Sequence, residues 1–89
     1  MNTQSKIENK LKENFNIFQL IIEDDSDKHK NHKKDTSGGH FNLLIVSDDF
    51  ITIPLIQRHR LIYKVLDQMI KVEIHALSIT AKTIQEYNN

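Results

Sequence analysis

The sequence predicts one domain that contains both helices and strands, of the α/β (α+β) class. Its elements follow the order α-β-β-α-β-α. Its 89 residues are enough for one domain with one hydrophobic core. Apolar residues recur at helical spacing in 5–14 and 55–70, and they alternate or cluster as in strands in 17–23, 40–46 and 72–82. A helix separates the second and third strands, and a right-handed crossover makes such strands parallel when they are neighbours. We therefore expect a mixed three-stranded sheet with helices on one face, formed by residues 1–89 without a linker.

The first helix is expected to begin at Ser5 and to end near Asn14. The run from Ser5 to Glu8 matches a capping box, in which the serine hydroxyl and the glutamate carboxylate each bond a backbone N–H that the helix leaves unpaired. Ile7 and Leu11 are four residues apart and would lie on the same face of this helix.

Two strands and a long loop follow the first helix. The β-branched and aromatic residues of 17–23 predict a buried strand. Residues 24–39 carry no long apolar side chain, change from acidic to basic and end in two glycines, which predicts a long, mobile loop. Phe41, Leu43 and Ile45 alternate in the second strand. The loop would join the two strands as an antiparallel hairpin.

The second half of the chain predicts a helix, a strand and a short terminal helix. Pro54 is expected in the first turn of its helix, where the missing N–H costs nothing. An apolar stripe would continue that helix to about residue 70; its members are Leu55, Ile62, Val65, Leu66 and Met69. Residues 72–82 alternate as the third strand. The run from Thr83 to Glu86 is a second capping-box match and would begin the last helix.

Composition excludes several classes of protein. Twelve lysines and arginines balance twelve acidic residues, so the whole chain has no net attraction for nucleic acid. The absence of cysteine excludes disulfides, thiol nucleophiles and thiolate metal sites. No run approaches the ~18 apolar residues of a membrane span, and the polar residues 1–11 do not resemble a secretory signal. We expect a soluble, cytoplasmic protein.

The motifs of common enzymes are also missing. The sequence contains no glycine-rich phosphate loop, no serine-nucleophile motif and no HExxH helix. The chain is therefore expected to be a binding module and not an enzyme.

Two histidines stand out by their neighbours. His59 lies between Arg58 and Arg60 on the predicted second helix. It is either a polar surface residue or part of a contact with an anionic group of a partner, such as a phosphate or a carboxylate. His75 opens the third strand with the same parity as Leu77. It is either a boundary residue of an apolar strand face or a ligand.

Three further histidines give weaker signals. His40 precedes the core of the second strand and is expected to be structural. His29 and His32 lie three residues apart in the loop, among lysines, either as a solvated basic segment or as a weak metal signal. A self-contained zinc site is not expected, because such a site needs about four ligands with a defined second shell.

Three segments together resemble the BolA family. They are a strand ending in Val46-Ser47-Asp48-Asp49-Phe50, a helix carrying Gln57-Arg58-His59-Arg60-Leu61-Ile62-Tyr63, and a strand opening with His75-Ala76-Leu77-Ser78-Ile79. The resemblance covers essentially the whole chain, and the Arg-His-Arg run followed at this distance by His-Ala is its specific part. One departure is visible: family members usually have Phe-x-Gly where this chain has Phe50-Ile51-Thr52.

The resemblance implies a BolA-type domain, similar in topology to class II KH domains, that works with monothiol glutaredoxins. In such complexes a [2Fe–2S] cluster bridges the two proteins, held by a glutaredoxin cysteine, a glutathione thiol and a histidine matching His75. A second BolA ligand comes from the loop between the first two strands, and the cysteine-free loop of this chain is similar to the histidine subgroup. The family's serine followed by histidine falls on Ser26 and His29, with His32 as the alternative.

These implications define an expected role. The chain alone would be a monomer without a cofactor. With glutaredoxin and glutathione it would form a heterodimer that serves iron–sulfur cluster trafficking or iron and redox sensing.

Nucleic-acid binding is the alternative function. BolA-like proteins of bacteria are also described as transcriptional regulators, and Arg58, Arg60 and Lys64 could form a basic surface with the loop lysines. The Gly-x-x-Gly loop with which KH domains clamp a nucleic-acid backbone is missing from the corresponding place.

Overall fold

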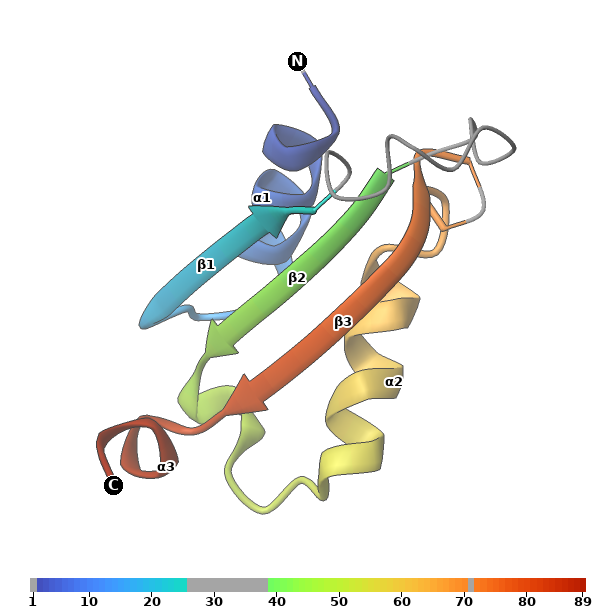
Figure 1. Cartoon of the computed structure of the whole chain (residues 1–89). Helices are drawn as coiled ribbons and strands as arrows, with labels where there is room; N and C mark the ends of the chain where they lie inside the picture. The colour runs from blue at the N-terminus through green and yellow to red at the C-terminus, as the bar shows by residue number, and fades with distance from the viewer. Residues whose placement is uncertain (1, 26–38, 71) are drawn as a thin grey trace.

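The predicted order of elements is confirmed in the computed structural model, which describes residues 2–25, 39–70 and 72–89 (Figure 1). The elements are α1 (Thr3–Asn14), β1 (Gln19–Asp24), β2 (Gly39–Val46), the 3₁₀ helix η2 (Asp48–Phe50), α2 (Leu55–Val65), β3 (Ile74–Lys82) and α3 (Ile84–Asn88). The predicted loop 24–39 falls mostly on residues outside the described ranges.

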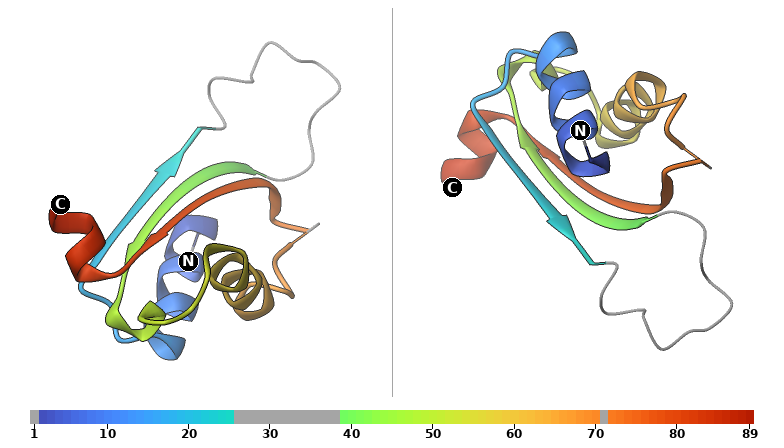
Figure 2. Two further views of the ribbon diagram at one scale, coloured as in Figure 1. Left: turned by 90° about the horizontal axis from the view of Figure 1, so that it is seen from below. Right: turned by 90° about the horizontal axis from the view of Figure 1, so that it is seen from above.

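The three strands form one mixed sheet in the order β1-β2-β3. β1 pairs with β2 antiparallel and β2 pairs with β3 parallel, as predicted from the hairpin and the crossover. Figure 2 shows α1 and α2 side by side on one face of this sheet, while α3 lies beyond the end of β3, apart from that layer. The parallel pairing places the first residues of β2 and β3 at the same end of the sheet.

The core lies between the sheet and the two long helices. Phe41, Leu43 and Ile45 of β2 are all buried, which confirms the predicted face of that strand. Ile7 of α1 and Ile62 of α2 have no exposed surface and belong to the same apolar cluster. Burial of this apolar face is the main force that holds the helices on the sheet.

Two predicted helix boundaries are wrong. α1 begins at Thr3, because the Asn2 side chain caps it by accepting a hydrogen bond from the Ser5 backbone N–H at 2.8 Å, so Ser5 is not the cap. α2 ends at Val65 instead of near residue 70. The Met69 carbonyl accepts hydrogen bonds from the backbone N–H groups of residues 73 and 74, each at 3.0 Å, and these bonds turn the chain into β3.

The second capping box is confirmed. The Thr83 hydroxyl accepts from the Glu86 N–H at 3.2 Å, and the Glu86 carboxylate accepts from the Thr83 N–H at 2.8 Å. This reciprocal pair explains why a helix as short as α3 forms at all.

The turn before α2 shows what replaces the missing glycine. Ile51 has φ −58° and ψ 133°, Thr52 has φ 68°, and the Phe50 carbonyl accepts from the Ile53 N–H at 3.0 Å. These values describe a type II turn, whose third position favours glycine because its φ is positive. Thr52 keeps the turn despite its branched Cβ, which is unfavourable in this region.

Replacing Thr52 by glycine is expected to raise the free energy of unfolding by about 1 kcal/mol. The left-handed conformation costs a residue with a Cβ about 1–2 kcal/mol, and glycine avoids this cost. Part of the gain is lost because glycine loses more chain entropy on folding. Chemical denaturation measures the change. Thr52→Ala is the control, since it removes the branch but keeps the Cβ and should recover only a small part. A stability equal to or below that of the original chain in Thr52→Gly would mean that the turn stores no strain.

Candidate functional site at the loop end of the sheet

His75 occupies an irregularity in the sheet. Gly39 of β2 pairs with Ile74 of β3, but the next residue, His40, pairs with Ala76. Two steps along β3 therefore match one step along β2, and His75 is the extra residue of a β-bulge. Bulges bend a strand and redirect a side chain. His75 is accordingly exposed, although its strand parity had suggested that it continues the apolar face of Leu77.

The bulge brings two imidazoles together. The ring centroids of His40 and His75 lie 5.0 Å apart, with their planes inclined by 46°. His40 was expected to be structural, and sequence reasoning missed this contact. The signal that could have found it is topological, because His40 and His75 stand near the beginnings of two strands that the crossover makes parallel.

The chain segment with the other candidate ligands joins the sheet at this same end. The Asp25 N–H donates to the His40 carbonyl at 2.7 Å, and the Gly39 N–H donates to the Glu73 carbonyl at 2.9 Å. His29 and His32 lie between Asp25 and Gly39, outside the residues that the structure describes. His29 is the fourth residue after Asp25, a chain span of at most about 14 Å.

A shallow hollow of about 220 Å³ adjoins the imidazole of His40. His40, Asp25 and Asn42 contribute to its lining. The Asn42 amide donates to the Asp25 carboxylate, which fixes a negative charge close to His40.

Among the described residues no group of three or more His, Cys, Asp or Glu side chains could hold a metal ion. Within the same ranges, no helix is long and apolar enough to cross a membrane.

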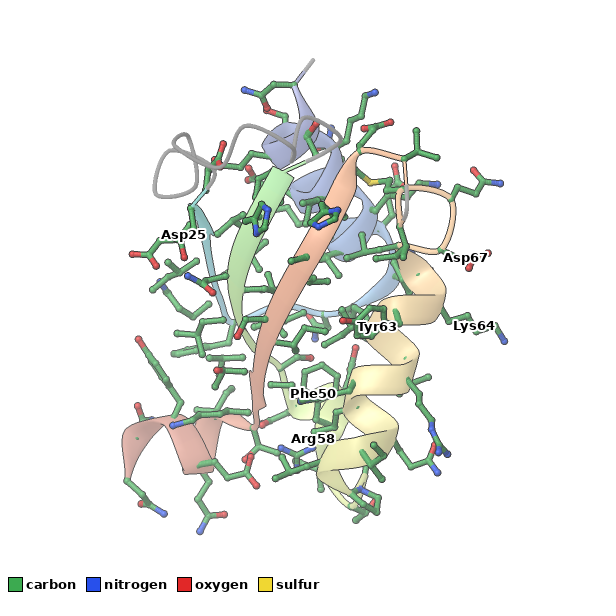
Figure 3. The ribbon with its side chains drawn as sticks, turned by 45° about the vertical axis from the view of Figure 1, so that its right-hand side comes forward. Asp25, Phe50, Arg58, Tyr63, Lys64 and Asp67 are labelled. Carbon is green, nitrogen blue, oxygen red and sulfur yellow. The ribbon has the colours of Figure 1, made fainter. Side chains whose placement is uncertain are left out.

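Arg58 is not at the surface, which corrects its expected role as a contact for a partner or for nucleic acid. It is 5% exposed and lies between α2 and the end of the sheet, beneath Phe50 (Figure 3). Its guanidinium donates to the Ile53 carbonyl at 2.7 Å and to the Ala81 carbonyl at 3.0 Å, and it holds both carboxylate oxygens of Glu86 at 2.6 and 3.2 Å. A guanidinium with these partners is structural.

The same contacts change the acidity of α3. Hydrogen bonds from Arg58, followed by the bond from the Thr83 backbone N–H, lower the pKa of Glu86 from 4.5 to about 2. Glu86 is thus a carboxylate over the whole neutral and mildly acidic range, and it ties α3 to α2.

The remaining residues of the basic helix differ in exposure. Arg60 and Lys64 are exposed, and Figure 3 shows Lys64 projecting from the outer side of α2. His59 is half-buried. Since its neighbour Arg58 reaches Ala81 near the end of β3, His59 lies toward the opposite end of the sheet from His75. The structure therefore separates the histidine pair from the basic residues of α2.

Comparisons with known proteins agree on one family. A family model described as BolA-like protein matches residues 11–86. The DNA-binding transcriptional regulator BolA of Haemophilus influenzae is 38% identical, over 98% of this chain and 82% of that protein. SufE-like protein 1, chloroplastic/mitochondrial, of Arabidopsis thaliana is 42% identical over 91% of this chain, which spans 24% of that longer protein. The solved structure of BolA1 from Arabidopsis thaliana superposes with a TM-score of 0.83, at 38% identity, over 97% of this chain and 96% of that one.

Proposed function

Because the chain belongs to the BolA-like protein family, we propose that it is a cytoplasmic partner of a monothiol glutaredoxin and shares a bridging [2Fe–2S] cluster with it. Its role would be iron–sulfur cluster trafficking or iron and redox sensing. The observation that supports this proposal is the position of His75, which a bulge exposes at the sheet end where the loop with His29 and His32 begins and ends.

The residues fit the group that the resemblance implies. Iron in a [2Fe–2S] cluster accepts imidazole in place of thiolate, and the neutral nitrogen ligand raises the reduction potential of the cluster. His75 would supply one such nitrogen, and His29 would supply the second, with His32 as its alternative. The glutaredoxin cysteine and the glutathione thiol would complete the ligands, so this chain needs to contribute only two. When bound, the cluster supplies a one-electron redox centre.

Exposure and charge suit a shared ligand. An exposed imidazole can meet a partner without the removal of a covering element. Imidazole must be neutral to bind a metal, so His75 has to be deprotonated in the complex. A chain that holds the cluster only through histidine can also release it more readily than one that binds through thiolate, which fits transfer or sensing better than storage.

Mixing tests the proposal directly. The chain is combined with a monothiol glutaredoxin, glutathione, ferric iron and sulfide without oxygen, and size-exclusion chromatography is followed by absorption and circular dichroism. A one-to-one heterodimer with a spectrum distinct from that of the glutaredoxin homodimer is expected. Separate elution of the two proteins, with the spectrum of the homodimer unchanged, would reject it.

Binding to duplex DNA is a second candidate function, favoured by relatives such as the DNA-binding regulator of Haemophilus influenzae and by the exposed Arg60 and Lys64. If these two residues contact phosphates, Arg60→Ala with Lys64→Ala should reduce the slope of log K against log salt by about 2. Fluorescence anisotropy with a labelled duplex at several salt concentrations measures that slope.

The control for the DNA test removes the same charge from another helix. Lys10→Ala with Lys12→Ala neutralises two exposed lysines of α1 and should leave the slope nearly unchanged. No binding of the original chain at low salt, or an equal loss of slope in both double variants, would dismiss α2 as a DNA contact.

A further inference from the structure

The distance between the His40 and His75 rings matches that between two imidazole ligands on one metal ion. An imidazole nitrogen bound to zinc lies about 2.0–2.1 Å from the metal, which places the ring centre about 3.2 Å away. Two such rings at a tetrahedral angle have centres about 5 Å apart. The observed separation of the His40 and His75 centroids is 5.0 Å. The backbone therefore already holds the rings at the spacing that a shared metal ion requires.

We propose that His40 and His75 form a two-imidazole site that binds a single Zn²⁺-like divalent cation in the free chain. The inference deepens the proposed function and rests on it for the later fate of His75, because the cation would occupy the imidazole that the glutaredoxin complex needs. Bound cation and bridging cluster then exclude one another at His75. The supply of free divalent metal would regulate how much of the chain is available for the complex.

Two features of the surroundings support a cation at this place. Asp25 lines the same hollow as His40, and the negative charge of its carboxylate attracts a cation bound there. His75 is also exposed, so water can complete the coordination of an ion that takes only two protein ligands. The backbone at the pair is held on both strands, by the bond from Asp25 to the His40 carbonyl and by that from Gly39 to the Glu73 carbonyl.

Simple ring packing is the competing explanation of the pair. Aromatic side chains commonly contact each other with centroids about 4.5–7 Å apart in tilted arrangements, and the observed pair satisfies this range as well. The two explanations differ in what they predict for metal affinity. If the rings only pack, each histidine binds the metal ion independently, with the weak affinity of a single imidazole. If they form a site, removing either ring abolishes most of the affinity for the metal ion.

The test uses the full chain with Zn²⁺ as the probe. His29→Asn with His32→Asn serves as the background, so that the loop imidazoles cannot bind the ion. Calorimetry gives the affinity, and ¹H–¹⁵N NMR of the imidazole rings identifies the ligands. We expect one ion per chain, with shifts at both His40 and His75. Adding His40→Ala or His75→Ala to this background should weaken binding about tenfold or more, because each removes the intramolecular second ligand. Adding His59→Ala should change nothing.

The outcomes separate this inference from the proposed function. Equal, weak binding in the background and in its His40→Ala derivative would leave only ring packing and overturn the site, even if the glutaredoxin complex forms. Conversely, Zn²⁺ binding that needs both rings would support the site even if no cluster complex forms. In the otherwise unchanged chain, His40→Ala should still give the heterodimer spectrum, since its loop histidines and His75 remain. Loss of that spectrum would contradict the division between the cation pair and the cluster ligands.

Discussion

Replacing His75 by alanine is expected to return the spectrum of the glutaredoxin mixture to that of the glutaredoxin homodimer. The substitution removes an exposed imidazole at the bulge of β3 and leaves the buried core of the sheet untouched. Its effect on folding should therefore be small, while the complex loses the imidazole that is proposed to bind the cluster. Absorption and circular dichroism of the reconstituted mixture measure the change, and thermal unfolding of the free variant checks the fold.

A matched histidine elsewhere supplies the control for this loss. His59→Ala also removes one imidazole, but from α2 and toward the opposite end of the sheet. It should keep the heterodimer spectrum. If the spectrum of the His75→Ala mixture equals that of the original chain, His75 is not a ligand, and a different donor must carry the proposed function.

Most of the fold could be predicted from local patterns because each pattern has one dominant physical cause. Alternation of Phe41, Leu43 and Ile45 predicted the buried face of β2, since successive strand residues point to opposite sides. The crossover through a helix predicted the parallel pairing of β2 with β3. The second capping box was also recognisable, because all its partners lie within four residues of one another.

One error was local, and two arose where contacts between distant residues decide the structure. Ser5 fits a capping box as well as Thr83 does, but Asn2 caps α1 first. The bulge at His75 cannot be read from β3 alone, because it is a mismatch of register between two strands. Arg58 was expected to contact a partner or nucleic acid, whereas its partner is Glu86, which lies 28 residues away in the sequence. No periodicity in the sequence links those two residues.

The candidate site was predictable only in part for the same reason. His75 stood out through its place in a motif, whereas His40 has no distinguishing neighbour in the sequence. The strand pairing brings the two rings together. The status of His29 and His32 as cluster ligands stays a prediction, because these residues lie outside the described ranges.

Replacing Arg58 by alanine is expected to lower the free energy of unfolding by about 3 kcal/mol, a large part of the roughly 5–10 kcal/mol typical of a domain of this size. The substitution leaves two carbonyls, of Ile53 and Ala81, without their donor and removes the cation that binds Glu86. It also empties the space beneath Phe50, whose ring centroid lies 5.8 Å from the guanidinium carbon. The melting temperature should fall by about 10 °C or more. Chemical and thermal denaturation measure both quantities.

Two neighbouring substitutions show whether geometry or charge is responsible. Arg58→Lys keeps the positive charge but cannot bond both oxygens of Glu86 and two carbonyls at once, so it should recover only part of the loss. Arg60→Ala removes an exposed arginine two residues away and should change the unfolding free energy by less than about 0.5 kcal/mol. Equal stability of Arg58→Ala and Arg60→Ala would contradict the structural role of Arg58.

The same contact makes stability depend on acid in a definite direction. Arg58 and the Thr83 N–H lower the folded-state pKa of Glu86 to about 2, while the unfolded chain titrates near 4.5. Between these values the unfolded state binds more protons, so the stabilisation is present above pH 4.5 and is lost as the pH falls toward 2.

Glu86→Gln should remove this part of the pH dependence. The difference in unfolding free energy between the original chain and Glu86→Gln is therefore expected to shrink across that window. In the Arg58→Ala background most of the difference should disappear at every pH, because the group that lowers the pKa most is gone. A difference that stays constant from neutral pH to pH 2 would mean that Glu86 is not held by Arg58 in solution.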